Sequence, residues 1–392
     1  MMYTLLRSDA CVQIPGGWLA DRYGGKWPFG ISILAQSIIS LLTPVAARLH
    51  LSVFLLLRVL SGLSSGFQVP AVYALIARWS APKSRSHIVT VMVNGISAGL
   101  FVGMTLSGVL CDHGFAGGWP SVFYVFGMVG CLWSAAWLLL VYDSPSTHPR
   151  ISTTELEYWQ TEIGAAYLAA CPRTPWREML TSVPVWALGV ALFACDWGTS
   201  TVASCIPLFM NDVLGFDVTK NGLLSAVPFL SSGSMIPVSW LADWLRSSGR
   251  MSTDVIRKVF LATGLVLAAC FMVITGYVGC DRLLAVLFVF LANASLLISY
   301  TVVNTNQLDL APLHAGYVMG LTNFVATLAH IAVPHVVGAM TYPRSTHSEW
   351  QSVFLLTSGV YFVGTIVFVI FGSGHRQSWA DYEYVQLTTR DS

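Results

Sequence analysis

Long apolar segments alternate with short polar junctions along most of the chain. Ten of these segments hold about 20 or more mostly apolar residues, which is the length that a helix needs to cross the hydrocarbon core of a bilayer. The pattern therefore predicts ten membrane-spanning helices. They cover Trp27–Ala47, Leu51–Arg78, Ile88–Cys111, Trp119–Val141, Val183–Met210, Asn221–Leu241, Val259–Gly279, Leu283–Leu308, Gly316–Met340 and Gln351–Phe371.

The tetrapeptide Trp-Leu-Ala-Asp occurs twice, ending at Asp21 and at Asp243. Four predicted spans follow each copy, and two predicted spans precede the second copy. This spacing indicates two related halves of six helices, with the motif after the second helix of each half. The predicted divisions are an N-terminal bundle at 1–141, a cytosolic linker with an amphipathic helix at 142–180, a C-terminal bundle at 181–372 and a cytosolic tail at 373–392.

The first half is shorter than this symmetry requires. Only 20 residues precede Asp21, and they include Arg7 and Asp9. An ionised side chain costs about 2.5–3.5 kcal/mol at the centre of a membrane helix. We therefore expect an all-α polytopic membrane protein in which the first helix and part of the second are missing. The first residues also lack the apolar core and cleavage site of a signal peptide.

Composition excludes several classes of protein. Hydrophobic residues make up 55% of the chain and charged residues 10%, whereas soluble domains carry about 25% charged residues. A net charge of +1 argues against a nucleic-acid partner, which needs a strongly basic face. The eight cysteines form no Cys-x-x-Cys pair, and we expect neither a bound metal nor a cofactor.

The basic residues predict an orientation in the membrane. If the first Trp-Leu-Ala-Asp loop lies in the cytosol, 14 Lys and Arg residues face the cytosol and four face the opposite side. This bias is the one that the positive-inside rule requires. In the cytosolic linker, Ser152 and Glu155 have the spacing of a capping box, which predicts a surface helix over Thr153–Ala169.

The first loop carries a dense set of glycine, acidic and basic residues. Glycine permits a sharp turn, and the charged residues can form ion pairs that break and re-form. The set resembles the loop between helices 2 and 3 of the major facilitator superfamily, which the resemblance identifies as a cytosolic gate. The candidate gate residues are Gly17, Asp21, Arg22, Gly24, Gly25 and Lys26 in the first half, with Asp243 and Arg246 in the second.

Further segments resemble one branch of that superfamily, the anion–cation symporters, which include sialin-like, vesicular glutamate transporter-like and sodium–phosphate cotransporter-like proteins. The matching segments are collinear from about Gln13 to Asp381. They include QIPGGWLADRYGGK, LLRVLSGLSSGFQVPA, APKSRS, GWPSVFYVFGMVGCLW, TPWREMLTSVPVWAL and NQLDLAP.

The resemblance implies a fold of two pseudo-symmetric six-helix bundles. It also implies a secondary transporter of small organic or inorganic anions, a carboxylate or a phosphate, with H⁺ or Na⁺ or the membrane potential as driving force. We expect a monomer in the plasma membrane or in an endosomal, lysosomal or vesicular membrane. The alternative is a truncated, non-transporting isoform that regulates or binds other proteins.

Three residues of the fourth family helix are candidates for the substrate or coupling pathway. Arg58 places a guanidinium within an apolar segment, where it can bind a carboxylate or phosphate through two hydrogen bonds. The family often has a proton-coupling glutamate at the position of Ser65, and serine does not exchange a proton at physiological pH. Tyr73 stands where several relatives have histidine.

The other candidates for this pathway lie in later segments, and each has a purely structural alternative. Asp196 can titrate or bind sodium, or it can pair with a neighbouring helix. The vesicular glutamate branch has an arginine at the position of Cys195, so glutamate selectivity of that kind is not expected. Amide and imidazole groups can contact substrate or join helices. They belong to Asn94, Asn304, Asn306 and His330.

Overall fold

The computed structural model describes residues 2–81, 85–161, 175–206, 208–209, 231–278, 281–342 and 346–380, and in these ranges the regular structure is helical. Nine helical stretches in the described part are long and apolar enough to cross a membrane. The sequence predicts ten spans, and residues 221–230 of the remaining one, Asn221–Leu241, lie outside the described residues. Residues 231–241 are seen in a short helical turn and in α13.

The first half contains six α-helices: α1 (Met2–Tyr23), α2 (Lys26–Leu49), α3 (Leu51–Ser65), α4 (Gln68–Trp79), α5 (Arg85–His113) and α6 (Trp119–Leu140). The linker contains α7 (Thr153–Trp159) and α9 (Trp176–Thr181). The second half contains α10 (Val183–Ser200), α13 (Met235–Ser247), α14 (Thr253–Tyr277), α15 (Arg282–Leu310), α16 (Ala315–Thr341) and α17 (His347–Phe371). Short helical turns are η1 (Pro145–Thr147), η3 (Thr201–Cys205), η4 (Ser231–Ser234), η5 (Pro312–His314) and η6 (Ser378–Ala380).

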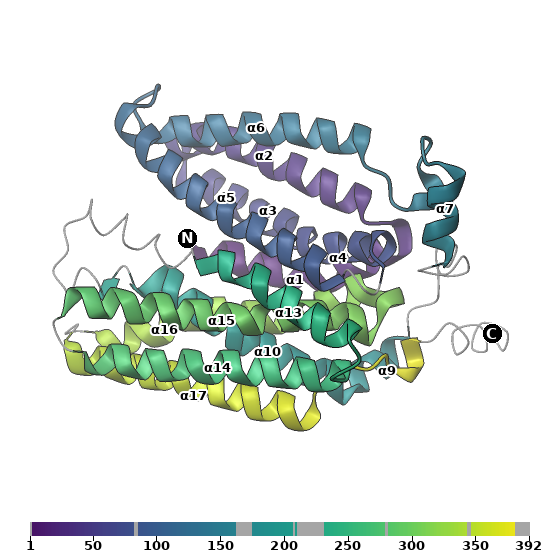
Figure 1. Cartoon of the computed structure of the whole chain (residues 1–392). Helices are drawn as coiled ribbons and strands as arrows, with labels where there is room; N and C mark the ends of the chain where they lie inside the picture. Colours follow the sequence, from purple (N-terminus) through teal and green to yellow (C-terminus); the bar gives the residue numbers. More distant parts are fainter. Residues whose placement is uncertain are drawn as a thin grey trace.

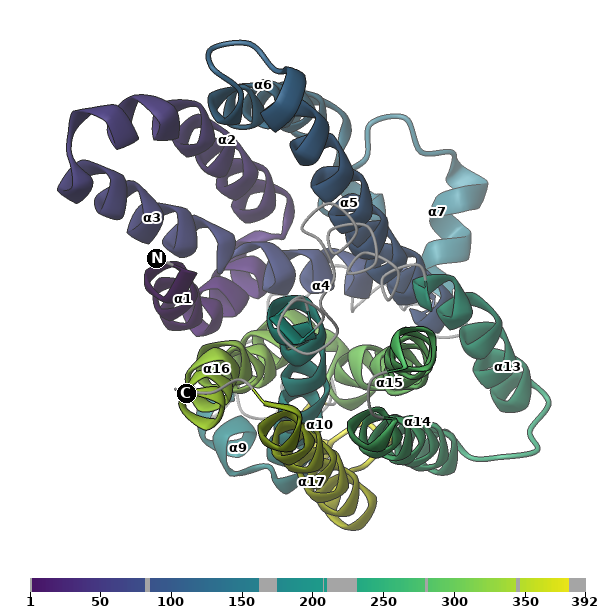
Figure 2. The same ribbon diagram turned by 90° about the vertical axis from the view of Figure 1, so that its left-hand side faces the viewer.

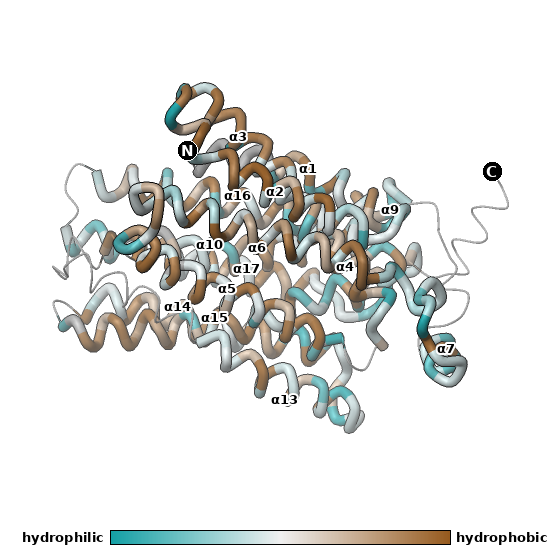
Figure 3. The backbone as a smooth tube through the Cα atoms, turned by 90° about the horizontal axis from the view of Figure 1, so that it is seen from above, coloured by the Kyte–Doolittle hydropathy of each residue, from teal (hydrophilic) through white to brown (hydrophobic). Residues whose placement is uncertain are grey.

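The two halves lie side by side, with α2 and α6 at the outer edge of one and α14 and α17 at the outer edge of the other (Figures 1 and 2). Between them, α1 and α4 pack against α16, and α5 packs against α13 and α15. The outer faces are apolar: Leu132, Leu139 and Leu140 of α6 are each more than 70% exposed. By contrast, much of α7 in the linker is hydrophilic (Figure 3). These exposed leucines suit contact with lipid.

The predicted fourth family helix, Leu51–Arg78, consists of two helices, α3 and α4. The regular helix is interrupted at Gly66 and Phe67 between them. A Cβ atom at Gly66 would lie 2.6 Å from the carbonyl oxygen of Asp9 on α1, so glycine permits α1 to cross the junction closely. In the linker, α7 begins at Thr153 as predicted, and Ser152 Oγ accepts from Glu155 N at 3.2 Å; residues 162–169 of the predicted helix lie outside the described residues.

Candidate functional site

A cavity of about 300 Å³ lies between the halves, lined by residues of α4, α5, α10, α15 and α16. We refer to it as the central cavity. Apolar side chains form most of its wall, and a few polar groups converge in it, which is typical of a small-molecule site. Four of the eight predicted pathway residues line it: Tyr73, Asp196, Asn304 and His330.

An acidic and an imidazole group meet on one wall of the central cavity. His330 Nε2 on α16 lies 3.4 Å from Asp196 Oδ2 on α10. The Asp196 side chain is 8% exposed and that of His330 is 32% exposed, so the ring faces the cavity while the carboxylate lies behind it. An ionisable pair at this depth of a membrane protein usually marks a functional pathway.

The wall of the central cavity also carries a hydrogen bond across the two halves. Tyr73 on α4 donates its hydroxyl to Asn304 Oδ1 on α15 at 3.1 Å. Asn304 Nδ2 in turn donates to Tyr300 O at 2.9 Å. Separation of the halves at this level would break the first bond and expose two polar groups to whatever fills the cavity.

The other four predicted pathway residues do not line the central cavity. Asn94 Nδ2 donates to Thr90 O of its own helix at 2.9 Å, and Asn306 Nδ2 donates to Ser373 O at 3.0 Å. Arg58 turns toward α2 and α6: its guanidinium donates to Thr43 Oγ1 at 3.2 Å. It also lies over the ring of Phe123, 5.6 Å from the ring centroid.

Ser65, the last of the four, contacts a carboxylate from another helix. Its hydroxyl donates to Asp9 Oδ1 at 2.9 Å, and Gln13 Nε2 donates to Asp9 Oδ2 at the same distance. Gln13 also reaches α16, with Nε2 3.1 Å from Thr327 Oγ1 and Oε1 2.6 Å from Asn323 Nδ2. Asp9 was not among the predicted site residues, although a carboxylate within the apolar segment before the first Trp-Leu-Ala-Asp motif is a signal in the sequence for a functional group.

Asp21 joins the two halves at the predicted cytosolic end. Its carboxylate accepts the backbone N–H groups of Gly316 and Tyr317, at 3.1 and 2.8 Å. These residues form the first turn of α16, where N–H groups have no partner within the helix and the helix dipole is positive. Arg78, which the sequence did not single out, donates to the carbonyl oxygen of Asp21 at 2.8 Å. Asp21 therefore caps a helix of the opposite half.

The gate glycines allow the backbones to approach. A Cβ atom at Gly17 would overlap the carbonyl oxygen of Gly316 and lie 2.8 Å from Tyr317 Cα. Gly24 has φ of 93°, which favours glycine, and Gly25 lies against the carbonyl oxygen of Ala71. Gly24 and Gly25 form the sharp turn from α1 to α2, whereas Gly17 lies within α1.

The basic gate residues of the first half lie over aromatic rings. The Arg22 guanidinium is 5.3 Å from the ring centroid of Trp18, and Lys26 Nζ is 4.9 Å from that of Tyr142. The backbone N–H of Lys26, at the start of α2, donates to Asp143 Oδ1 at 2.8 Å. That bond stays within the first half, unlike the contact that Asp21 makes.

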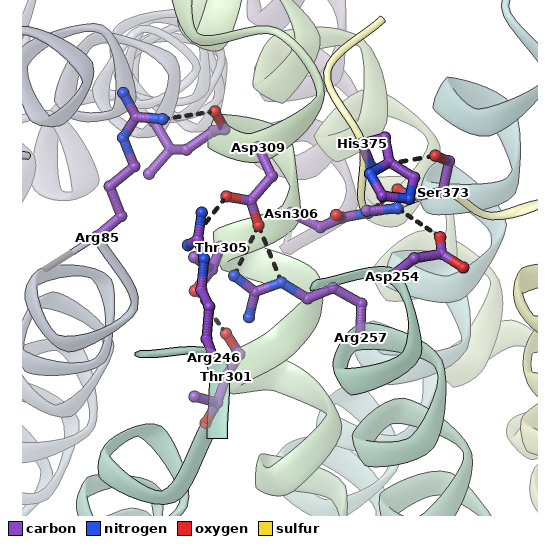
Figure 4. A network of polar contacts seen from close by, with 12 residues as sticks. Arg85, Arg246, Asp254, Arg257, Thr301, Thr305, Asn306, Asp309, Ser373 and His375 are labelled. Atoms are coloured by element: carbon purple, nitrogen blue, oxygen red, sulfur yellow. Dashed lines mark hydrogen bonds and ion pairs between the residues drawn. The ribbon is translucent and has the colours of Figure 1, made fainter. Parts of the chain in front are cut away.

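A second polar cluster lies at the same end, around Asp309 on α15 (Figure 4). Arg257 Nε and Nη2 donate to Asp309 Oδ2 at 2.9 and 2.6 Å, and Arg246 Nη1 lies 3.7 Å from Oδ1. Arg85, at the start of α5 in the other half, donates to Leu308 O at 3.1 Å. Arg246, a predicted gate residue, thus takes part in this cluster together with Arg257, which was not among the predicted site residues. Asp243 lies on α13 in the turn before Arg246.

Together these contacts hold the halves closed at the predicted cytosolic end, with a partly polar cavity deeper in the membrane. Within the described ranges, no three His, Cys, Asp or Glu side chains are placed to hold a metal ion. The arrangement leaves space for a small polar molecule between the halves.

The sequence matches the model of the Major Facilitator Superfamily over residues 2–334. Vesicular glutamate transporter 2 of Homo sapiens is 39% identical over 376 residues, which are 95% of this chain and 64% of the relative. Vesicular glutamate transporter 3 of Danio rerio is 38% identical, with 95% of this chain and 63% of the relative covered. Sialin of Ovis aries is 38% identical over 369 residues, 94% of this chain and 74% of the relative. The chain thus spans less than two thirds of the length of these vesicular glutamate transporters.

Solved structures share the fold. The proton:xylose symporter XylE superposes with a TM-score of 0.73 at 14% identity, over 98% of this chain and 87% of that chain. The human organic anion transporter MFSD10 superposes with a TM-score of 0.69 at 16% identity, over 93% of this chain and 82% of that chain. At these identities the likeness concerns the fold alone.

Proposed function

Because the chain belongs to the major facilitator superfamily, in the branch of sialin and the vesicular glutamate transporters, we propose that it carries small organic or inorganic anions across a membrane by secondary active transport. The two halves would expose the central cavity to one side of the membrane at a time. The family and the fold are those of multi-span membrane transporters and not of enzymes.

One observation carries the proposal: the cavity lies between the halves, and contacts across the halves close one end. Asp21 binds the N-terminus of α16, and Arg85 binds the end of α15. Both contacts join residues that rocking of one half against the other would separate. A cavity bounded in this way can open to one side while it stays closed to the other.

The class of substrate rests on the relatives and on the chemistry of the wall. The names of the relatives refer to glutamate transport and to sialin, and both point to anions. Asn304 has a second amide N–H that can donate to a carboxylate or a phosphate, and the Tyr73 hydroxyl can do so once its bond to Asn304 is broken. Protons, sodium ions or the membrane potential would supply the driving force.

Transport can be tested with the purified chain in proteoliposomes. We expect saturable uptake of at least one of labelled N-acetylneuraminic acid, glutamate and inorganic phosphate when a pH gradient, a sodium gradient or a membrane potential is imposed. Empty liposomes give the background. No uptake of any of the three under any gradient would contradict the proposal, and binding without uptake would favour a regulatory membrane protein.

A pair of asparagines on α15 tests the site. Asn304→Ala removes an amide that lines the central cavity, and we expect it to lower uptake about tenfold, as the loss of one polar contact to an anion does. Asn306→Ala is the matched control, because Asn306 bonds Ser373 O outside the cavity. Equal uptake by the two variants would remove Asn304 from the substrate site.

A further inference from the structure

Three ionisable side chains gather where α1, α10 and α16 meet. Asp9 precedes Asp21 by 12 residues, a rise of about 18 Å along a helix, and His330 follows Ala315 by 15 residues, about 22 Å. The hydrocarbon core is about 30 Å thick. Both residues therefore lie deep in the membrane, beyond its middle as measured from the predicted cytosolic end.

The three groups come from both halves. His330 and Asp196 belong to the second half, and their side chains are 3.4 Å apart. Asp9 belongs to the first half and is tied to α16 through Gln13, whose amide bonds both Asp9 and Thr327. Thr327 precedes His330 by one turn of α16, so Gln13 holds the Asp9 carboxylate close to the part of α16 that carries His330. A carboxylate of each half thus lies near His330.

The cluster has no fixed positive charge among the described residues. No Lys or Arg in this part of the chain forms an ion pair with Asp9 or Asp196. With a neutral imidazole the cluster carries two negative charges in a medium of low dielectric constant, where they repel strongly. Of the other charged side chains on helices packed against α16, Asp21, Arg22, Arg78 and Asp309 lie toward the predicted cytosolic end, and Glu349 lies in the first turn of α17. The tyrosines Tyr73, Tyr300 and Tyr361 on these helices are uncharged at neutral pH.

We propose that Asp9, His330 and Asp196 form a proton-binding site, and that the proton carried by His330 couples transport to a proton gradient. The coupling rests on the transport function proposed above, whereas proton binding does not. A proton on the imidazole forms an ion pair with Asp196, is attracted by the nearby charge of Asp9, and lowers the charge of the cluster from −2 to −1. This site supplies a carboxylate beside Ser65 from α1, where the helix that carries Ser65 has none.

The position of the site makes proton binding depend on conformation. Asp9 faces His330 only while α1 and α16 are packed together, as the bonds from Gln13 to Thr327 and Asn323 require. When the halves part at this level, His330 keeps Asp196 but loses Asp9. The proton is then held less tightly. By reciprocity, a bound proton favours the packed state, which is the linkage that proton-coupled transport needs.

A proton fits this site better than a sodium ion. The imidazole is a neutral nitrogen base that sodium, a hard cation, does not prefer. Gln13 Oε1 already accepts from Asn323. The two oxygens of Asp9 accept from Ser65 and from Gln13. These oxygens thus have hydrogen-bond donors, whereas His330 Nε2 can take up a proton toward Asp196.

The test is an NMR titration of the full chain in lipid nanodiscs with ¹⁵N-labelled histidine. His330→Gln identifies the signal of His330 by its loss. We expect Asp196→Asn and Asp9→Asn each to weaken proton binding by this ring about tenfold or more, because each removes one neighbouring negative charge. His335 lies on the same helix with its Nδ1 against Ile331 O, and its signal should not move in either variant.

Two outcomes would overturn the proton site. One is a His330 titration midpoint that neither aspartate variant moves, in samples that elute as the wild type does from size exclusion. The other is a midpoint that sodium chloride shifts and choline chloride does not, which would assign the carboxylates to sodium.

Transport then tests the coupling separately. In proteoliposomes loaded as above, His330→Gln should abolish accumulation driven by a pH gradient while exchange of labelled for unlabelled anion continues, since exchange moves no net proton. His335→Gln should behave as the wild type does. Accumulation that is independent of pH and unaffected by His330→Gln would refute the coupling while leaving transport intact. If the wild type moves no anion, transport and coupling both fail and the titration alone decides whether the proton site exists.

Discussion

At the predicted cytosolic end, the Asp309 carboxylate forms ion pairs with two arginines, Arg257 and Arg246. The Asp309 and Arg257 side chains are 4% and 2% exposed, and two hydrogen bonds join them. Arg246 lies farther away and is partly exposed. The attraction between two buried charges offsets the free energy of removing them from water only while both remain paired. Removal of one partner therefore leaves the other as an unpaired buried charge. The two partners are not equivalent, because Asp309 has a second cation, Arg246, at 3.7 Å.

Asp309→Asn should therefore destabilise the protein more than Arg257→Met does. The first change leaves a buried guanidinium without its carboxylate, a loss of about 3–5 kcal/mol. After the second change Arg246 remains near Asp309, and we expect a smaller loss of stability. Melting temperatures of the two variants in detergent measure both losses. Lys258→Met is the control, because Lys258 forms a partly exposed pair with Asp254 on the same helix, worth about 0–1 kcal/mol. Equal melting temperatures for all three variants would contradict this account.

At the scale of the element, α1 and α16 form the closest contact between the halves. Gly17 meets the first turn of α16, and Gly320 meets the carbonyl group of Gln13, with 3.1 Å from the site of its absent Cβ to the carbonyl carbon. Small residues at such positions let helix backbones approach within a membrane. The same approach places Asp9, Gln13 and Thr327 in hydrogen-bonding reach.

Gly320→Ala should separate α1 from α16, because the added methyl group meets the Gln13 backbone. We expect longer distances between spin labels on the exposed residues Tyr23 and Ser248, measured by double electron–electron resonance after replacement of the exposed Cys11, Cys111 and Cys270. Gly338→Ala is the matched control on the same helix, since its Cβ would meet no atom within 4 Å. The same shift in both variants would point to a general disturbance of α16.

Hydropathy and the repeated motif were sufficient to predict the helical fold and nine spans, since both signals are local in sequence. Which face of a helix turns inward was not predictable in the same way. Lipid is as apolar as a protein core, so the lipid-facing and protein-facing sides of a membrane helix differ little in hydrophobicity. Arg58, for example, contacts Thr43 and Phe123 within the first half and does not line the central cavity, and its role in the pathway stays a prediction. The contact between Ser65 and Asp9, 56 residues apart, depends on how α1 crosses the break at Gly66.

At the scale of the whole molecule, the structure is closed at one end by contacts that belong to no single half. Asp21 and Asp143 show the difference. Each carboxylate accepts a backbone N–H at the start of a helix, Asp143 from Lys26 within its own half and Asp21 from Tyr317 in the opposite half. The first bond is kept when the halves move as rigid bodies. The second exists only in the closed arrangement, so it contributes directly to the equilibrium between closed and open states.

Asp21→Asn should therefore shift the whole molecule toward the state that is open at the predicted cytosolic end. A carboxylate at a helix N-terminus is worth about 1–2 kcal/mol when partly buried, which corresponds to a change of about 5- to 30-fold in the closed-to-open ratio. The spin-label pair at Tyr23 and Ser248 reports that ratio as the fraction of long distances. Asp143→Asn makes the same chemical change at a helix start but within one half, and we expect the wild-type ratio. If Asp143→Asn opens the molecule as much as Asp21→Asn does, the contact between Asp21 and α16 is not what holds the two halves closed.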